Sequence, residues 1–180
     1  MWEAIWWLVA VPVLLAGIGV YLSWTAGRVD RMHGRVDTAR ATLDAQLQRR
    51  SGIAIELAAA GVLDPASAVL VADSAHRARA APEVGQEVAE SDLSQALVAA
   101  FADPEDVAEL RGDASDGNLV DELAAAGKRV QLARRFHNDA VRAARALRSH
   151  RLVRWLKLAG RAPMPRAMDF DDTAPPGLAT

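Results

Sequence analysis

The residues best suited to chemistry lie in LARRFHNDAV, residues 132–141. This stretch places His137 and Asn138 beside two arginines and Asp139, which raises the question of an acid–base pair. Helical spacing separates the candidates, because residues two apart point to different sides of a helix. One face collects Ala133, Phe136, His137, Ala140, Val141 and Ala144. The spacing therefore predicts that His137 and Asn138 specify a contact between helices.

A second candidate is DFDDT, residues 169–173, which matches the D-x-D-x-T pattern of aspartyl-phosphate hydrolases. That pattern needs a nucleophilic Asp at the end of a buried strand, whereas proline, arginine and alanine precede it here and only seven residues follow. The four histidines are His33, His76, His137 and His150. None forms an H-E-x-x-H arrangement, and there is no cysteine. We therefore expect no enzyme, no catalytic, cofactor-binding or metal-binding residues, no cofactor and no small-molecule substrate.

Charge is distributed unevenly along the chain. The net charge is only −2, yet residues 83–122 hold twelve acids and one base, and residues 128–166 hold twelve bases and one acid. We expect these two stretches to face each other, in the fold or in an oligomer. The alternative is that the basic stretch contacts anionic lipid or nucleic acid. Its irregular spacing, without interleaved aromatic residues, disfavours nucleic acid.

The N-terminal stretch AIWWLVAVPVLLAGIGVYLSW, residues 4–24, contains no Asp, Glu, Lys or Arg. At roughly 1.5 Å per residue it is about 30 Å long, the thickness of the hydrocarbon core of a bilayer. Tryptophans at both ends resemble the aromatic belts of membrane helices. A cleaved signal peptide is disfavoured by the length of the apolar stretch and the missing basic start. The sequence predicts a single membrane-spanning anchor within residues 1–27.

The charges that flank this segment predict its orientation. Glu3 is the only charge before it, whereas Arg28, Arg31, Arg35 and Arg40 follow it closely. By the positive-inside rule, the N-terminus lies outside and the bulk of the chain is cytoplasmic at the cell membrane.

The remaining chain predicts an all-α fold, a bundle of long antiparallel helices over residues 28–161 with an irregular tail at 162–180. Helices are expected from 28 to 61, continuous with the membrane helix, from Pro65 to about 81, from about 83 to 101, from Pro104 to 110, and from 119 to 159. The composition of residues 112–118 predicts a loop. The inward positions of the third helix are expected to be Val84, Val88, Leu93, Leu97 and Phe101. Those of the last helix include Leu123, Val130, Leu152 and Trp155 besides the face given above.

The first and last long helices are the expected partners. Small residues (Ala41, Ala45, Ala133, Ala140) would let them approach closely. His137 and Asn138 would then meet the DAQLQRR segment, residues 44–50, and fix the register of the pair.

Three stretches carry a resemblance to a known family. VDTARATLDAQLQRR (36–50), LARRFHNDAV (132–141) and MPRAMDFDD (164–172) resemble, in order and spacing, the three signatures of the LemA family. The chain looks like a divergent member, with His137-Asn138 where the family has Tyr-Asn. The resemblance implies a bacterial protein with an N-terminal membrane helix, a cytoplasmic helical bundle and no known catalytic residues. The helix-packing signature then comprises Leu47, Arg49, Arg50, Phe136, His137, Asn138 and Val141.

The expected function is that of a membrane-anchored helical scaffold or interaction protein on the cytoplasmic face, with a protein partner or a second copy of itself. The alternative is an anionic-lipid or nucleic-acid-binding module that uses the basic last helix. Its candidate contact residues are Arg142, Arg145, Arg148, Arg151, Arg154 and Lys157.

Overall fold

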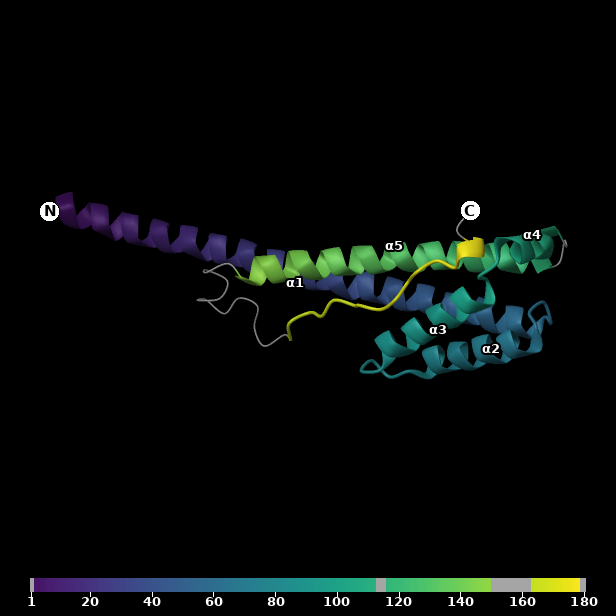
Figure 1. Ribbon diagram of the computed structural model, residues 1–180. Coiled ribbons are helices and arrows are strands. Elements are labelled where there is room, and N and C mark those ends of the chain that lie inside the picture. The colour runs from purple at the N-terminus through teal and green to yellow at the C-terminus, as the bar shows by residue number, and fades with distance from the viewer. Residues whose placement is uncertain (1, 113–115, 150–162, 179–180) are drawn as a thin grey trace. The chain divides into compact units, whose positions relative to one another are not determined.

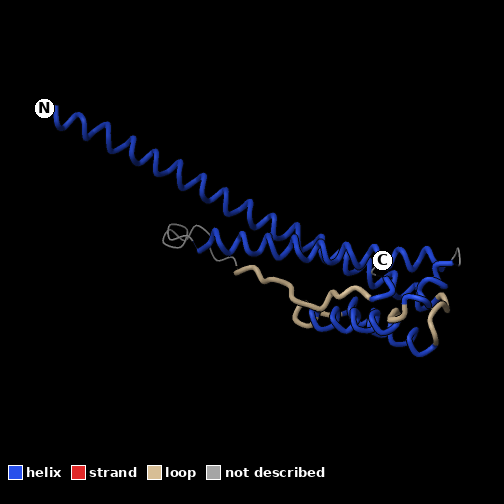
Figure 2. The backbone as a smooth tube through the Cα atoms, turned by 45° about the horizontal axis from the view of Figure 1, so that its top comes forward, coloured by secondary structure: helices blue, strands red, loops and turns tan. Residues whose placement is uncertain are grey.

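The computed structural model describes residues 2–112, 116–149 and 163–178 (Figures 1 and 2). It contains the α-helices α1 (Trp2–Ala59), α2 (Pro65–Ala80), α3 (Gln86–Ala100), α4 (Pro104–Gly112) and α5 (Asp116–Ser149), and the 3₁₀ helix η1 (Pro176–Leu178). Across these residues all regular structure is helical, which confirms the all-α prediction.

Local sequence signals account for most helix ends. Gly61, two residues past α1, adopts a φ of +75°, a conformation that costs glycine nothing. Asp64 begins α2 by accepting hydrogen bonds from the amides of Ala66 (3.0 Å) and Ser67 (3.1 Å). Hydrogen bonds from the Ser67 hydroxyl and from both amides hold the pKa of the Asp64 carboxyl below its usual value. The loop expected up to residue 118 is shorter than predicted, because α5 already begins at Asp116.

The chain forms two compact units. Unit 1 comprises residues 1–38 and 139–166, and unit 2 comprises 39–138 and 167–180. Helices α1 and α5 each contribute to both, whereas α2, α3, α4 and η1 belong to unit 2. The tail from residue 167 onward therefore belongs to the unit with the larger core. The predicted domain limits after residues 27 and 161 remain predictions.

In unit 1 the N-terminal part of α1 is long and apolar enough to cross a membrane. Its most apolar stretch has a mean hydropathy of 1.8, and its side chains are almost all exposed. Farther along α1, Val36 packs against Val141 and Ala144 of α5, with Met32 and Ala140 at the edge. The two helices therefore pair here through small and β-branched side chains.

The core of unit 2 is built by every one of its helices. Ile53, Ala54 and Leu57 of α1 pack with residues of α2 to α5 and with Leu178 of η1. The other buried members are Val71, Ala75, Ala78, Leu93, Ala96, Leu97, Phe101, Val107, Val120, Leu123 and Ala126. Helices α2 and α3 lie side by side in both views of the backbone (Figures 1 and 2).

Several expected inward positions prove to be exposed. The predictions for Leu93, Leu97 and Phe101 are confirmed, but Val84 (96% exposed) and Val88 (67%) are not buried. Val84 precedes α3, which starts only at Gln86, so the helical periodicity assumed for it does not apply. Phe136 is 61% exposed, because His137 and Ala133 occupy the centre of the buried face of α5. Ala41 and Ala45 are also exposed, and Leu152 and Trp155 lie outside the described residues.

The tail predicted to be irregular has no α-helix, yet it is part of the core. Met168, Phe170 and Leu178 are each no more than 6% exposed. Gly177 donates its amide hydrogen to the carbonyl of Phe101 (3.1 Å), which brings η1 against the start of α4. A Cβ atom at Gly177 would lie 2.5 Å from Val107 Cγ2 and 3.0 Å from the Phe101 carbonyl oxygen. Only glycine fits this approach.

This close approach gives a matched pair of glycine substitutions. Gly177→Ala should lower the free energy of unfolding by roughly 1–3 kcal/mol, because the added methyl group overlaps buried atoms. Gly127→Ala, in the interior of α5 with nothing within 4 Å of its Cβ position, should instead raise it by roughly 0.5–1 kcal/mol. Chemical denaturation of the detergent-solubilised chain measures both. Equal effects of the two substitutions would contradict the packing described for η1.

Candidate functional site

The three signature segments meet in one place in unit 2. A second buried cluster joins Leu43 and Leu47 of α1, Val130 and Ala133 of α5, and Met168 and Phe170 of the tail. Each segment supplies one pair of apolar side chains. The helices contribute no aromatic side chain to this cluster, so Phe170 of the tail provides its largest surface. The tail is therefore a structural partner of the two long helices.

Asn138 binds the tail through both ends of its side-chain amide. Its Nδ2 donates to the carbonyl of Met168 (2.9 Å), and its Oδ1 accepts from the amide of the same residue (2.9 Å). This arrangement satisfies the whole backbone of one extended residue. The sequence predicted that Asn138 meets α1, and that prediction is wrong, because an extended chain has unpaired backbone groups and a helix does not. His137, 2% exposed, is buried beside it.

Arg134 and Gln131 hold the tail one and two turns earlier on α5. The Arg134 guanidinium donates to both carboxylate oxygens of Asp172, at 2.8 Å each. It also lies over the ring of Phe170, 5.5 Å from the centroid. Gln131 Nε2 donates to the Asp172 carbonyl (2.6 Å). Because both members of the ion pair are largely shielded from water, it is stronger than an ordinary surface pair.

Helix α3 binds the alternate residues of the same segment. The amide of Asp169 donates to the Glu87 carboxylate (2.7 Å), and the amide of Asp171 donates to Ser91 Oγ (3.0 Å). The Asp171 carboxylate in turn accepts from the hydroxyl and the amide of Thr173, which lowers the pKa of Asp171. The tail thus lies between α3 and α5, and its backbone is bound from both sides. We call this arrangement the tail groove.

A buried ion pair lies beside the tail groove. Arg50 of α1 donates to the Glu90 carboxylate of α3 at 2.6 Å, and the two side chains are 5% and 2% exposed. Arg50 also donates to Ser94 Oγ (3.0 Å) and to the Glu90 carbonyl (3.3 Å), while its Nε is buried without a hydrogen-bond partner. Burial raises the pKa of the Glu90 carboxyl, and the positive charge of Arg50 opposes that rise. The pair fixes α1 against α3 at one register.

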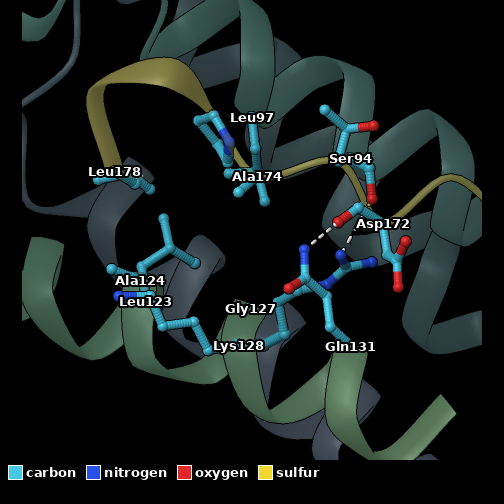
Figure 3. A pocket seen from close by; sticks show the side chains of 13 residues that line it. Ser94, Leu97, Leu123, Ala124, Gly127, Lys128, Gln131, Asp172, Ala174 and Leu178 are labelled. Atoms are coloured by element: carbon cyan, nitrogen blue, oxygen red, sulfur yellow. Dashed lines mark hydrogen bonds between the residues drawn. The ribbon is translucent and has the colours of Figure 1, made fainter. Parts of the chain in front are cut away.

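A small cavity adjoins this pair, lined by residues of α1, α3, α5 and the tail (Figure 3). Its volume is about 30 Å³, room for a water molecule or two and not for an organic substrate. Gln131 and Asp172 face it from one side, and Leu123 and Leu178 face it from the other. The lining joins an ion pair to apolar side chains, which is typical of a packing defect at a junction of elements.

The helix-packing residues inferred from the sequence divide into two groups. Leu47, Arg50, His137 and Val141 are buried, and Asn138 is bound to the tail. Arg49 and Phe136 are exposed and do not belong to the packed interior. Sequence reasoning missed Glu90, Arg134 and Asp172. Glu90 could have been found, because it lies three residues before the buried Leu93 on the same face of α3.

The basic residues proposed for lipid contact are only partly described. Arg142 pairs with Asp139, Arg145 donates to the Pro165 carbonyl (2.9 Å), and Arg148 donates to the Pro163 carbonyl (2.9 Å). Arg151, Arg154 and Lys157 lie outside the described residues.

The acidic stretch forms ion pairs with other segments than the basic one. Glu90 pairs with Arg50, and Asp92 pairs with Arg77 of α2. Asp121 pairs with Arg111, the single base within the acidic stretch itself. Arg134 of the basic stretch pairs with the tail. The expected packing of the acidic stretch on the basic helix is therefore not the source of these pairs.

The aspartates of DFDDT have structural contacts. Asp172 binds Arg134, Asp171 caps Thr173, and the Asp169 side chain is 98% exposed. Within the ranges 2–112, 116–149 and 163–178, no group of three or more His, Asp or Glu side chains is placed to hold a metal ion. The geometry of the tail groove thus suits the binding of a peptide segment and contains no arrangement for acid–base chemistry.

Comparisons with known proteins give no relative. No family model matches the chain, and neither a curated protein nor a solved structure matches it.

The buried ion pair yields a double-mutant prediction. Glu90→Leu or Arg50→Met alone should destabilise the chain by roughly 3–5 kcal/mol, because each leaves one buried charge without its partner. The double variant should lie within about 1 kcal/mol of the unsubstituted chain, since Ser94 Oγ still donates to the Glu90 carbonyl. Denaturant unfolding of all four proteins measures the coupling. A double variant as unstable as the sum of the singles would contradict the account.

The tail groove yields a second prediction. Asn138→Ala removes both hydrogen bonds to Met168 and should weaken tail binding by roughly 1–3 kcal/mol. Asp139→Ala, at the exposed neighbouring position, should change stability by less than about 0.5 kcal/mol. Hydrogen exchange of residues 167–173, followed by mass spectrometry, reports the binding of the tail directly. Unchanged protection of this segment in Asn138→Ala would show that the bonds to Met168 do not hold it.

Proposed function

We propose that this protein is a single-pass membrane protein whose unit 2 is a non-catalytic scaffold or interaction module on the cytoplasmic face. The observation that carries the proposal is the exposed apolar helix at the start of α1, followed at once by arginines. A helix of this kind is stable in water only if it is covered, and a bilayer covers it over its whole circumference.

The use of the polar residues in unit 2 supports the non-catalytic part of the proposal. Arg50, Glu90, Arg134, Asn138 and Asp172 all serve contacts between elements. Polar groups spent in this way specify one arrangement of long helices that are otherwise rich in alanine.

The relationship to the LemA family remains part of the proposal. Its three signature stretches are distant in the sequence, and the tail groove gives a physical reason why they would be retained together. Leu47, Ala133 and Phe170 share one cluster, and Asn138 and Asp172 lie at its border. A family that kept this groove would keep these three stretches.

The orientation is tested by reporters at the two ends of the chain. A fluorescent protein fused after Thr180 should fold and fluoresce in the cytoplasm, whereas alkaline phosphatase at the same position should be inactive. The same two reporters placed before Met1 serve as the matched control and should give the opposite result. Extraction of membranes at alkaline pH should leave the chain in the pellet. Active phosphatase after Thr180 would overturn the orientation, and release by alkali would overturn the membrane span.

A further inference from the structure

The two units carry charges of opposite sign. Unit 1 holds eleven Arg and Lys against four Asp and Glu, a formal net charge of +7, and unit 2 holds ten against nineteen, a net charge of −9. The unit that includes the apolar part of α1 is thus the strongly basic one. Such segregation creates a field that attracts anions to the basic unit.

The basic residues of α1 in this unit form a stripe. Arg28, Arg31 and Arg35 are exposed and follow each other at steps of three and four, which places them on one face. Asp30 and Asp37 each follow an arginine by two residues, a rotation of about 200°, and so lie on the opposite face. The arginine face is therefore not neutralised by the acids of its own helix.

The stripe begins at the end of the apolar segment. The Arg28 guanidinium lies over the Trp24 ring, 5.9 Å from its centroid. At 1.5 Å per residue, Arg28 lies about 6 Å and Arg31 about 10 Å beyond Trp24 along the helix axis. The headgroup layer is roughly 5–8 Å thick, and the screening length at physiological salt is about 8 Å. Both arginines therefore reach the depth of lipid phosphates.

Helix α5 returns a further base to this level. Val36 of α1 packs with Val141 and Ala144, whereas His33, three residues nearer the apolar segment, has its Nε2 3.5 Å from Nη1 of Arg148. The two helices thus run antiparallel in unit 1, and later residues of α5 lie nearer the apolar segment. Arg148 stands about 14 Å beyond Trp24, within reach of its long side chain.

The remaining acid of this part of unit 1 is Asp139, and it is paired with Arg142.

We propose that Arg28, Arg31 and Arg35, together with Arg148, form a basic collar that binds the headgroups of anionic phospholipids. The proposal rests on the membrane span of the proposed function and names the lipid that surrounds it. Guanidinium groups bind phosphate through paired hydrogen bonds, and the cytoplasmic leaflet carries the anionic lipids. The collar fixes the depth of α1 in the bilayer.

The collar is tested on the full chain in nanodiscs that contain phosphatidylcholine with a minority of phosphatidylglycerol. Electron paramagnetic resonance of spin-labelled lipids measures the fraction of each lipid held at the protein surface. Labelled phosphatidylglycerol should be preferred several-fold over labelled phosphatidylcholine. This preference should largely vanish at about 1 M salt, where the screening length is about 3 Å.

Two triple variants separate the collar from general charge. Arg28→Gln, Arg31→Gln and Arg35→Gln together should abolish most of the preference, whereas Arg49→Gln, Arg129→Gln and Arg135→Gln, exposed arginines of unit 2, should leave it unchanged. Asp30→Asn with Asp37→Asn should increase it. No preference in the unsubstituted chain, or an equal loss in both triples, overturns the proposal.

Two further measurements distinguish lipid binding from nucleic-acid binding and from loss of the membrane span. A random DNA duplex added to phosphatidylcholine nanodiscs should not bind, and binding that the collar triple abolishes would assign these arginines to nucleic acid instead. Alkaline extraction of the collar triple reports the membrane span separately. Retention in the pellet with loss of the lipid preference is expected, whereas release of the unsubstituted chain would refute the proposed function itself.

Discussion

An extended segment has no internal partners for its backbone N–H and C=O groups, so it can be buried only where other residues supply them. Residues 168–172 meet this condition through side chains of two helices. Asn138 and Gln131 of α5 bind carbonyl and amide groups from one side, and Glu87 and Ser91 of α3 bind amides from the other. Because these contacts allow Met168 and Phe170 to enter the interior, the second cluster of unit 2 depends on them.

The buried pair of Arg50 and Glu90 solves a related problem at the next layer. Alanine-rich helices slide past one another at little cost, because their surfaces carry few distinctive shapes. A charge pair that is 5% and 2% exposed tolerates no such slippage, since a shift would leave each charge buried alone. The apolar residues therefore stabilise unit 2, and the polar residues determine which arrangement it adopts.

The sequence predicts the helices of this protein better than it predicts their contacts. Asp64, Pro65 and Gly61 mark helix ends by local chemistry, and the structure agrees with them. Phe136 shows the limit, because a buried face of α5 about one residue wide either includes or excludes it, and partner helices decide which. The tail shows a second limit. Prolines and glycines correctly exclude a helix after residue 162, but they do not indicate whether the irregular chain is buried.

The candidate site was only half accessible from the sequence. Arg50, His137 and Asn138 were identified as contact residues, yet the partner expected for Asn138 was α1. Helical periodicity describes contacts between helices and has no term for an extended strand of residues bound beside them. The alternation of Met168 and Phe170 with aspartates was the available signal, since apolar residues at every second position indicate an extended segment with one buried side.

The position of the tail in the chain has a consequence for biosynthesis. Residues 167–178 leave the ribosome after all five helices that surround them, so the tail groove stays open while the rest of unit 2 is being made. Leu43, Leu47 and Val130 then lack their last apolar neighbours, and a chain that ends early exposes them permanently. Exposed apolar surface of this kind is what chaperones and proteases bind. The tail groove therefore distinguishes a finished chain from an incomplete one.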